Sequence, residues 1–72
     1  PAAVMERQGN TLRVFEEELL AECLGVFVQD YKGGRILPGL KRIVVKNYPD
    51  NAGEALTRAG FFREMQDYVL YH

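Results

Sequence analysis

The chain has 72 residues, 47% of them hydrophobic and 26% charged, which supplies one apolar core and leaves too few residues for two. Its formal net charge of −1 excludes strong overall attraction to nucleic acid or to an anionic membrane, so any such contact must be local. A single cysteine excludes an internal disulfide, and no apolar stretch approaches the roughly 20 residues that span a bilayer. These features predict one domain over residues 1–72, in a cytoplasmic setting and without membrane contact.

Two short strands open the chain. Apolar residues precede Glu6 and Arg7 over residues 2–7, and apolar and polar residues alternate over residues 11–15, so both segments are predicted to be short strands. Gln8-Gly9-Asn10 lies between them, and Gly9 takes positive φ without steric cost. The pattern predicts a hairpin. Because it begins almost at once after Pro1, which is not Met, we expect the chain to be a segment of a longer protein.

A helix follows over residues 16–32. Apolar residues from Leu19 to Tyr31 recur at spacings of one, three and four, which places them on one broad face. Three glutamates, residues 16–18, suit the positive end of the helix dipole. Lys32 followed by Gly33-Gly34 predicts the helix end, with a left-handed cap. Gly25 leaves open a kink or an early end.

A strand and a second, shorter helix come next. Pro38-Gly39 predicts a turn, and the β-branched residues within 41–48 predict the clearest strand of the chain. Asp50 or Asn51 is expected to cap the second helix, and Gly60 to end it.

The remaining residues, 61–71, suit a closing hairpin with its turn near Gln66-Asp67. The predicted fold class is therefore α+β: a two-layer ββαβαββ domain with two helices packed on one face of a mostly antiparallel sheet. The strand after the first helix is expected to run parallel to the strand before it, through a right-handed crossover.

Catalytic chemistry has few candidates in this chain. His72, the only histidine, is the last residue, where an exposed end is expected. Cys23 falls on the apolar face of the first helix and is expected to be an inert core thiol. The glycines match neither a P-loop nor GxGxxG. We therefore expect no catalytic residue, no metal and no cofactor in this segment.

Charge is distributed unevenly along the chain. Five acidic residues crowd the first helix, whereas the five charged residues from 32 to 46 are all basic. The candidate phosphate-binding residues are Lys32, Arg35, Lys41 and Arg42. The alternative is that Arg42 and Lys46 are ordinary solubilising residues on the outer sheet face, and that Lys32 only complements a helix end.

Aromatic residues offer a second device for binding nucleic acid, because rings beside basic side chains stack with unpaired bases. The candidates are Tyr31, Tyr48, Phe61, Phe62, Tyr68 and Tyr71. Most aromatic residues in so small a chain fill the core. Tyr68 and Tyr71 are three positions apart and so face opposite sides of a strand, and we expect the one that points away from the helices to be the better candidate.

Residues 1–12, a helix, a basic β-branched strand, Glu54-Ala55-Leu56 and Ala59-Gly60-Phe61-Phe62-Arg63 form a pattern over nearly the whole chain. This pattern resembles the C-terminal domain of large helicase-related (Lhr-type) DEAD/DEAH-box superfamily 2 helicases. Gln8-Gly9-Asn10 stands where that family carries a double glycine, and Tyr68 and Tyr71 where many relatives have Leu and Arg. The resemblance also implies a further strand just before Pro1.

The resemblance implies an intracellular, ATP-dependent parent helicase whose hydrolase motor lies upstream. This segment would be a non-catalytic accessory domain that contacts DNA or RNA, or docks on other domains of the parent. A uracil-DNA glycosylase role, also implied by the resemblance, would need a carboxylate such as Asp67 or Asp50 near a pocket for a flipped base. The third alternative is a protein-interaction or structural module that recruits a partner at an open strand edge.

Overall fold

The computed structural model describes residues 2–72. The strands are β1 (Ala3–Glu6), β2 (Thr11–Val14), β3 (Arg42–Val45), β4 (Phe62–Glu64) and β5 (Asp67–Tyr71). The α-helices are α1 (Leu20–Lys32) and α2 (Gly53–Ala59), each preceded by one 3-10 turn, Glu17–Leu19 and Asp50–Ala52. The predicted order ββαβαββ is confirmed.

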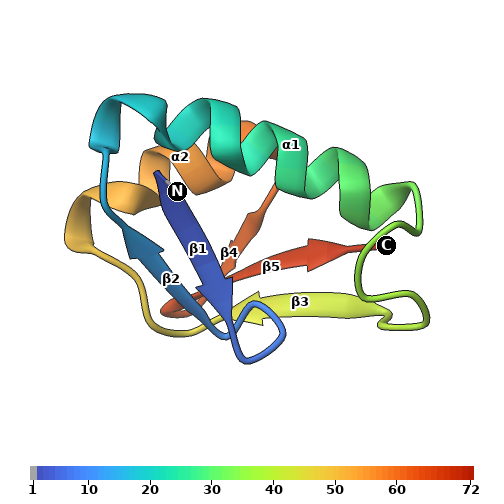
Figure 1. Ribbon diagram of the computed structural model, residues 1–72. Coiled ribbons are helices and arrows are strands. Elements are labelled where there is room, and N and C mark those ends of the chain that lie inside the picture. Colours follow the sequence, from blue (N-terminus) through green and yellow to red (C-terminus); the bar gives the residue numbers. More distant parts are fainter. Residues whose placement is uncertain (1) are drawn as a thin grey trace.

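Two layers make up the molecule, with both helices on one side of the strands (Figure 1). β5 lies between β3 and β4 and pairs antiparallel with each of them, so the three-stranded sheet has the order β3-β5-β4. β1 and β2 form a separate antiparallel hairpin. This is the predicted α+β architecture, with two small sheets in place of one continuous sheet.

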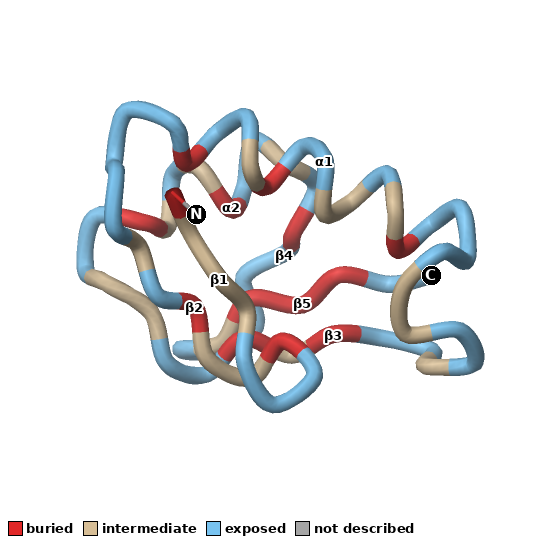
Figure 2. Tube along the Cα trace, in the orientation of Figure 1, coloured by how far each residue is buried: buried red, intermediate tan, exposed pale blue. Residues whose placement is uncertain are grey.

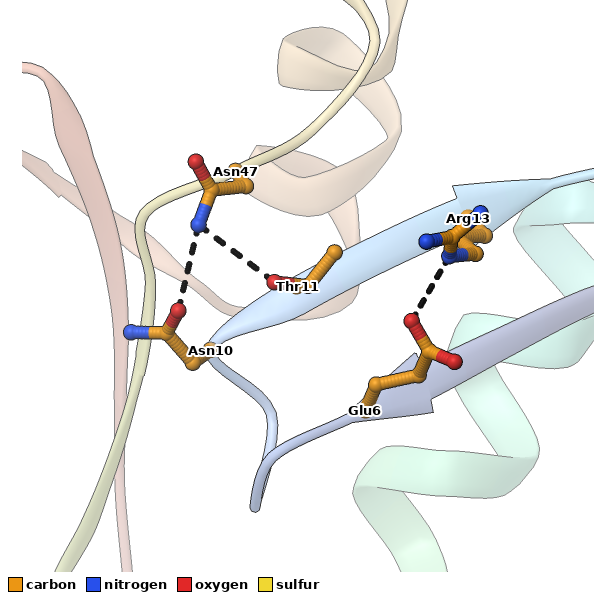
Figure 3. Close-up of polar contacts among 5 residues, drawn as sticks. All are labelled: Glu6, Asn10, Thr11, Arg13 and Asn47. Atoms are coloured by element: carbon orange, nitrogen blue, oxygen red, sulfur yellow. Dashed lines mark hydrogen bonds and ion pairs between the residues drawn. The ribbon is translucent and has the colours of Figure 1, made fainter.

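A polar junction joins the hairpin to the three-stranded sheet. Thr11 and Asn47 form a parallel bridge, in which the Leu12 amide donates to the Asn47 carbonyl at 2.8 Å. The Asn47 side-chain amide donates to Asn10 Oδ1 at 3.1 Å and to Thr11 Oγ1 at 3.3 Å (Figure 3). The chain just beyond the end of β3 therefore runs parallel to the start of β2 over a single bridge, and the predicted parallel pairing of the two strands themselves is not formed within residues 2–72.

Of the turns, helix ends and caps predicted from the sequence, some are confirmed and one is wrong. Gly9 has φ 90° in the hairpin turn, and α2 stops before Gly60, as predicted. α1 continues past Gly25 to Lys32. The predicted cap of the second helix is wrong, because neither Asp50 nor Asn51 caps it: the Asn51 side-chain amide instead donates to Glu17 Oε1 at 2.5 Å.

The core lies between the two layers, where the buried positions of the helices face those of β3 and β5 (Figure 2). Its members are Leu12, Leu20, Leu24, Tyr31, Ile43, Val45, Ala52, Leu56, Phe61, Tyr68 and Leu70. Full burial of a valine, leucine, isoleucine or phenylalanine side chain stabilises the fold by roughly 1.5–3 kcal/mol relative to exposure. Cys23, expected in the core, is only half-buried, in a small apolar cleft between α1 and β1. Neither helix of residues 2–72 has the length and apolar character needed to cross a lipid bilayer.

Candidate nucleic-acid interface

The end of α1 is closed by backbone hydrogen bonds that turn the chain back towards the sheet. Gly34 has φ 79°, and its amide donates to the Tyr31 carbonyl at 3.1 Å. The Arg35 amide donates to the Asp30 carbonyl at 2.9 Å. This is the left-handed cap that the sequence predicted. It begins the loop of residues 33–41, which lies at the end of the molecule where β3 starts and β5 finishes (Figure 1).

Tyr31 fixes the other end of this loop. Its ring is fully buried, and its hydroxyl donates to the Leu40 carbonyl at 2.5 Å. Burial raises the pKa of Tyr31, so its hydroxyl remains a donor to a higher pH than that of an exposed tyrosine. The ring also contacts His72 edge-on, with centroids 5.1 Å apart. The periodicity of the sequence places Tyr31 on the apolar face of the helix and does not indicate this role, although a buried tyrosine usually needs a partner for its hydroxyl.

Three of the four predicted phosphate-binding residues lie on this end of the molecule, and all three are exposed. Lys32 is the last residue of α1. Arg35 Nη1 lies 3.6 Å from Asp30 Oδ1, in an exposed ion pair that contributes little to stability. Lys41 lines a depression of about 480 Å³ together with Gly39, Leu40 and His72. We call Lys32, Arg35 and Lys41 the basic end.

Arg42, the fourth predicted residue, belongs to a neighbouring surface. It opens β3 opposite Tyr71 of β5, and with Val44 and Lys46 it lines a hollow on the sheet face that points away from the helices. Consecutive residues of a strand point to opposite faces, so Lys41 and Arg42 point to opposite sides of the start of β3. The four cations therefore do not form one flat patch. Three lie on the basic end, and Arg42 connects that end to the open sheet face.

The open sheet face carries two exposed aromatic side chains. Phe62 of β4 is 63% exposed and Tyr71 of β5 is 44% exposed. Their ring centroids are 6.4 Å apart and their planes are tilted by 47°. Tyr68 points inward and is buried, so Tyr71 is the tyrosine that faces away from the helices.

The other aromatic candidates are unavailable for stacking with a base. Tyr31 and Phe61 belong to the core. Tyr48 is half-buried and packs edge-on against the Tyr68 ring, with centroids 5.1 Å apart. The structure thus reduces the six aromatic candidates to Phe62 and Tyr71, because the other four rings are used for packing.

Two acidic residues share the open face with these rings. Asp67 accepts from Lys46 Nζ at 3.3 Å, which offsets the lysine charge. Glu64 accepts a hydrogen bond from the Tyr71 hydroxyl. That hydrogen bond, with burial and the negative charge of Glu64, raises the pKa of Tyr71, while Arg42 opposes the shift. Arg42 takes part in none of the ion pairs found within residues 2–72.

The residues considered for catalysis lie apart from one another. Asp67 is on the open sheet face, Asp50 is in an exposed 3-10 turn, and Cys23 is in the cleft behind β1. Within residues 2–72 there is no cluster of His, Cys, Asp and Glu side chains that could hold a metal ion. The candidate binding surface is thus the basic end, with its exposed cations, and the adjoining open sheet face, with its exposed rings.

Comparison of the chain with protein-family models, with curated proteins and with solved structures gives no match. The resemblance to Lhr-type helicases therefore stays a prediction from the sequence.

Proposed function

We propose that this domain is a non-catalytic module that contacts the phosphate backbone of DNA or RNA through Lys32, Arg35, Lys41 and Arg42. The observation that supports the proposal most directly is the arrangement of these cations. All four are exposed on adjoining surfaces, and within residues 2–72 only Arg35 is engaged in an ion pair, with Asp30. No acidic residue interrupts the chain between Lys32 and Lys46.

The loop geometry favours this use of the cations. Tyr31 and the left-handed cap hold both ends of the loop of residues 33–41, so Lys32 and Lys41 keep their relative positions before any ligand arrives. A preorganised loop loses less conformational entropy on binding than a free one. With four phosphate contacts, affinity for a single strand falls about 50-fold between roughly 50 and 200 mM salt.

The resemblance described above supplies the setting of this proposal. The domain would be an accessory part of an ATP-dependent DEAD/DEAH-box helicase of the Lhr type, in the cytoplasm. ATP binding and hydrolysis would belong to the motor of that parent protein. The contact made here would hold nucleic acid near the motor, or dock the domain on the rest of the parent.

The test is a fluorescence anisotropy titration of labelled single-stranded and duplex DNA with the 72-residue chain, at about 50 and 200 mM salt. We expect salt-sensitive binding, together with NMR amide shifts in residues 33–46. The double variant Lys32→Gln/Lys41→Gln should weaken binding and reduce the slope of log affinity against log salt by about 1.4 for a single strand.

A matched control removes two charges elsewhere. Arg13 is on the hairpin and Arg58 lies beside Glu17 and Glu18, at the opposite end of α1 from Lys32. Arg13→Gln/Arg58→Gln changes the net charge equally and should leave the salt slope unchanged. If both double variants lost the same amount of affinity, the site would not be localised. Absence of binding by the wild-type chain at about 50 mM salt would reject the proposal.

A second candidate function rests on the free edge of β1. The Phe15 amide donates to the Ala2 carbonyl at 2.7 Å, and Val4 pairs with Arg13, so the backbone groups of Ala3 and Met5 point away from β2. A groove of about 370 Å³ beside this edge is lined by Ala3, Glu22, Cys23, Val26, Phe27, Asp30 and Ile36. An edge of this kind suits addition of a strand from a protein partner. That function is favoured if nucleic acid does not bind.

A further inference from the structure

The outer face of the three-stranded sheet is open, although it carries an apolar row across all three strands. Phe62, Val69 and Val44 are paired side by side on β4, β5 and β3. Val69 is only 3% exposed, because its neighbours cover it, whereas Phe62 stays largely uncovered. Tyr71 and Arg42 form the next cross-strand pair towards the basic end.

Phe62 lies on an edge strand beside the buried Val69, and its ring stays 63% exposed. β4 pairs only with β5, and its other edge is free within residues 2–72. Unpaired edges with exposed apolar side chains invite aggregation, and natural proteins usually place charged residues or proline there. The ring of Phe62 lies beside the exposed ring of Tyr71, which is paired with Arg42, and this grouping of two rings and a cation favours a ligand on this face.

We propose that Phe62 and Tyr71 form a stacking platform for the bases of an unpaired nucleic-acid strand, with Arg42 contacting the adjacent phosphate. This inference rests on the proposed function and names the form of nucleic acid that the same site selects. The tilt of 47° and separation of 6.4 Å between the two rings mean that they are not stacked face to face, so each ring keeps a face for a base.

Arg42 gives the platform a continuous path to the basic end. It is paired across the strands with Tyr71 and is adjacent in sequence to Lys41, whose side chain points to the other side of the sheet. A backbone that crosses the start of β3 meets both cations, while its bases lie over the rings. Aromatic side chains beside basic ones are the usual device of proteins that bind single strands.

The surroundings of the rings favour an unpaired strand over the alternatives. In a duplex the base faces are already stacked on one another, so the rings have no base face to contact. Lys46 is offset by Asp67, whereas Glu64 accepts a hydrogen bond from the neutral Tyr71 hydroxyl and keeps its charge. Arg42 is the cation of this face that is left for a phosphate.

The experiment compares two phenylalanines of nearly equal exposure. Phe62 is 63% exposed on β4, and Phe15, between β2 and α1, is 62% exposed. Binding of labelled oligothymidylate of about twelve nucleotides, within the usual site sizes, is measured by fluorescence anisotropy for wild type, Phe62→Leu and Phe15→Leu. Leucine keeps the apolar character and removes the flat ring. We expect Phe62→Leu to weaken binding about tenfold with an unchanged salt slope, and Phe15→Leu to bind as wild type.

Two further measurements make the test specific. Tyr71→Leu should weaken binding to a similar extent, and both variants should keep the wild-type NMR spectrum in the core, because both side chains are exposed. Duplex DNA should bind more weakly than the single strand and lose nothing on Phe62→Leu. Since the chain has no tryptophan, binding should also quench its tyrosine fluorescence, and this quenching should shrink in Tyr71→Leu.

Failure of this inference differs from failure of the proposed function. If Phe62→Leu and Tyr71→Leu bind oligothymidylate as wild type does, while Lys32→Gln/Lys41→Gln weakens binding, the platform is rejected and the phosphate contact stands. Equal affinity for duplex and single strand would also reject the platform. If the wild-type chain binds neither nucleic acid even at low salt, both proposals fall together.

Discussion

The two faces of the β3-β5-β4 sheet are built from the same short strands and differ in almost every physical respect. The inner face presents Ile43, Val45, Tyr68 and Leu70, which are 0–7% exposed under the two helices. The outer face presents Arg42, Val44, Phe62 and Tyr71 around Val69, which is 3% exposed, and both helices lie on the other side of the strands (Figure 1). Successive strand residues alternate between the faces, so each strand contributes to both.

This difference separates stability from binding. On the inner face, aliphatic and aromatic side chains are closely packed, and a change in volume there alters the free energy of unfolding. On the outer face, the largely exposed ring of Phe62 lies beside Tyr71, which is paired with Arg42 and hydrogen-bonded to Glu64. We expect substitutions on the inner face to change stability and those on the outer face to change binding.

The largest expected effect tests how tightly the inner face is closed at Gly9. This glycine has φ 90°, and a Cβ atom placed there would lie 2.2 Å from Ile43 Cγ2. Gly9→Ala therefore adds a clash with the core to the strain of a left-handed backbone, and should lower the free energy of unfolding by about 3 kcal/mol. Urea denaturation followed by circular dichroism measures the change.

Gly39 provides the matched control for this substitution. It has a similar φ of 86°, but a Cβ atom there would have nothing within 4 Å. Gly39→Ala should cost about 1 kcal/mol, from backbone strain alone. If both substitutions lowered the free energy of unfolding equally, the hairpin turn would not be packed against Ile43 on the inner face.

A smaller effect comes from two adjacent valines of β3. Val45 is fully buried on the inner face, whereas Val44 is half-buried on the outer face. Val45→Ala removes two packed methyl groups and should cost about 2 kcal/mol, whereas Val44→Ala should cost less than about 1 kcal/mol. Thermal and urea unfolding of both variants check this. Similar losses would show that the outer face is as closely packed as the inner one.

The smallest effect concerns two tyrosines whose pKa values are raised for different reasons. Burial raises the pKa of Tyr31 on the inner side, whereas the hydrogen bond to Glu64 is the largest cause of the raised pKa of Tyr71 on the outer face. Glu64→Gln should lower the pKa of Tyr71 towards the ordinary value of about 10 and leave that of Tyr31 unchanged. Titration of the tyrosine ring signals by NMR separates the two residues.

The same shifts give the direction of the dependence of stability on pH. In the folded chain both hydroxyls keep their protons to a higher pH than in the unfolded chain. Their contribution to stability is therefore complete below about pH 10 and declines as pH rises through the folded-state pKa values. A gain of stability between pH 10 and 11 in urea unfolding would contradict the assigned directions.

Much of the fold follows from local patterns in the sequence. The period of apolar residues from Leu19 to Tyr31 identified α1, and the alternation around Gly9 identified the first hairpin, because side-chain periodicity reports directly which face of an element is buried. The helix end at Gly33-Gly34 was also predictable, since few residues other than glycine adopt a left-handed cap. The cap at Asp50 or Asn51 was not, because a tertiary partner, Glu17, takes the Asn51 side chain.

The candidate site was predictable in composition but not in arrangement. Lys32, Arg35, Lys41 and Arg42 stand out in the sequence as cations without intervening acids. Strand alternation offered the outer sheet face as an alternative for Arg42 and Lys46, and the structure places both there. Their order along the chain does not indicate that Arg42 lies opposite Tyr71, or that Phe62 is exposed while Phe61 is buried. Those outcomes depend on strand register, which is set by pairing between segments far apart in the sequence.

By itself, the sequence determined the type and order of the elements, the turns at its glycines and the excess of positive charge between residues 32 and 46, because these depend on neighbouring residues and their periodicity. Only the tertiary structure decided that β5 lies between β3 and β4, that the Tyr31 hydroxyl holds the Leu40 carbonyl, and that Phe62, Tyr71 and Arg42 share an open face. These features depend on which strands pair and in what register, and the pairing is fixed by burial of the inner face as a whole.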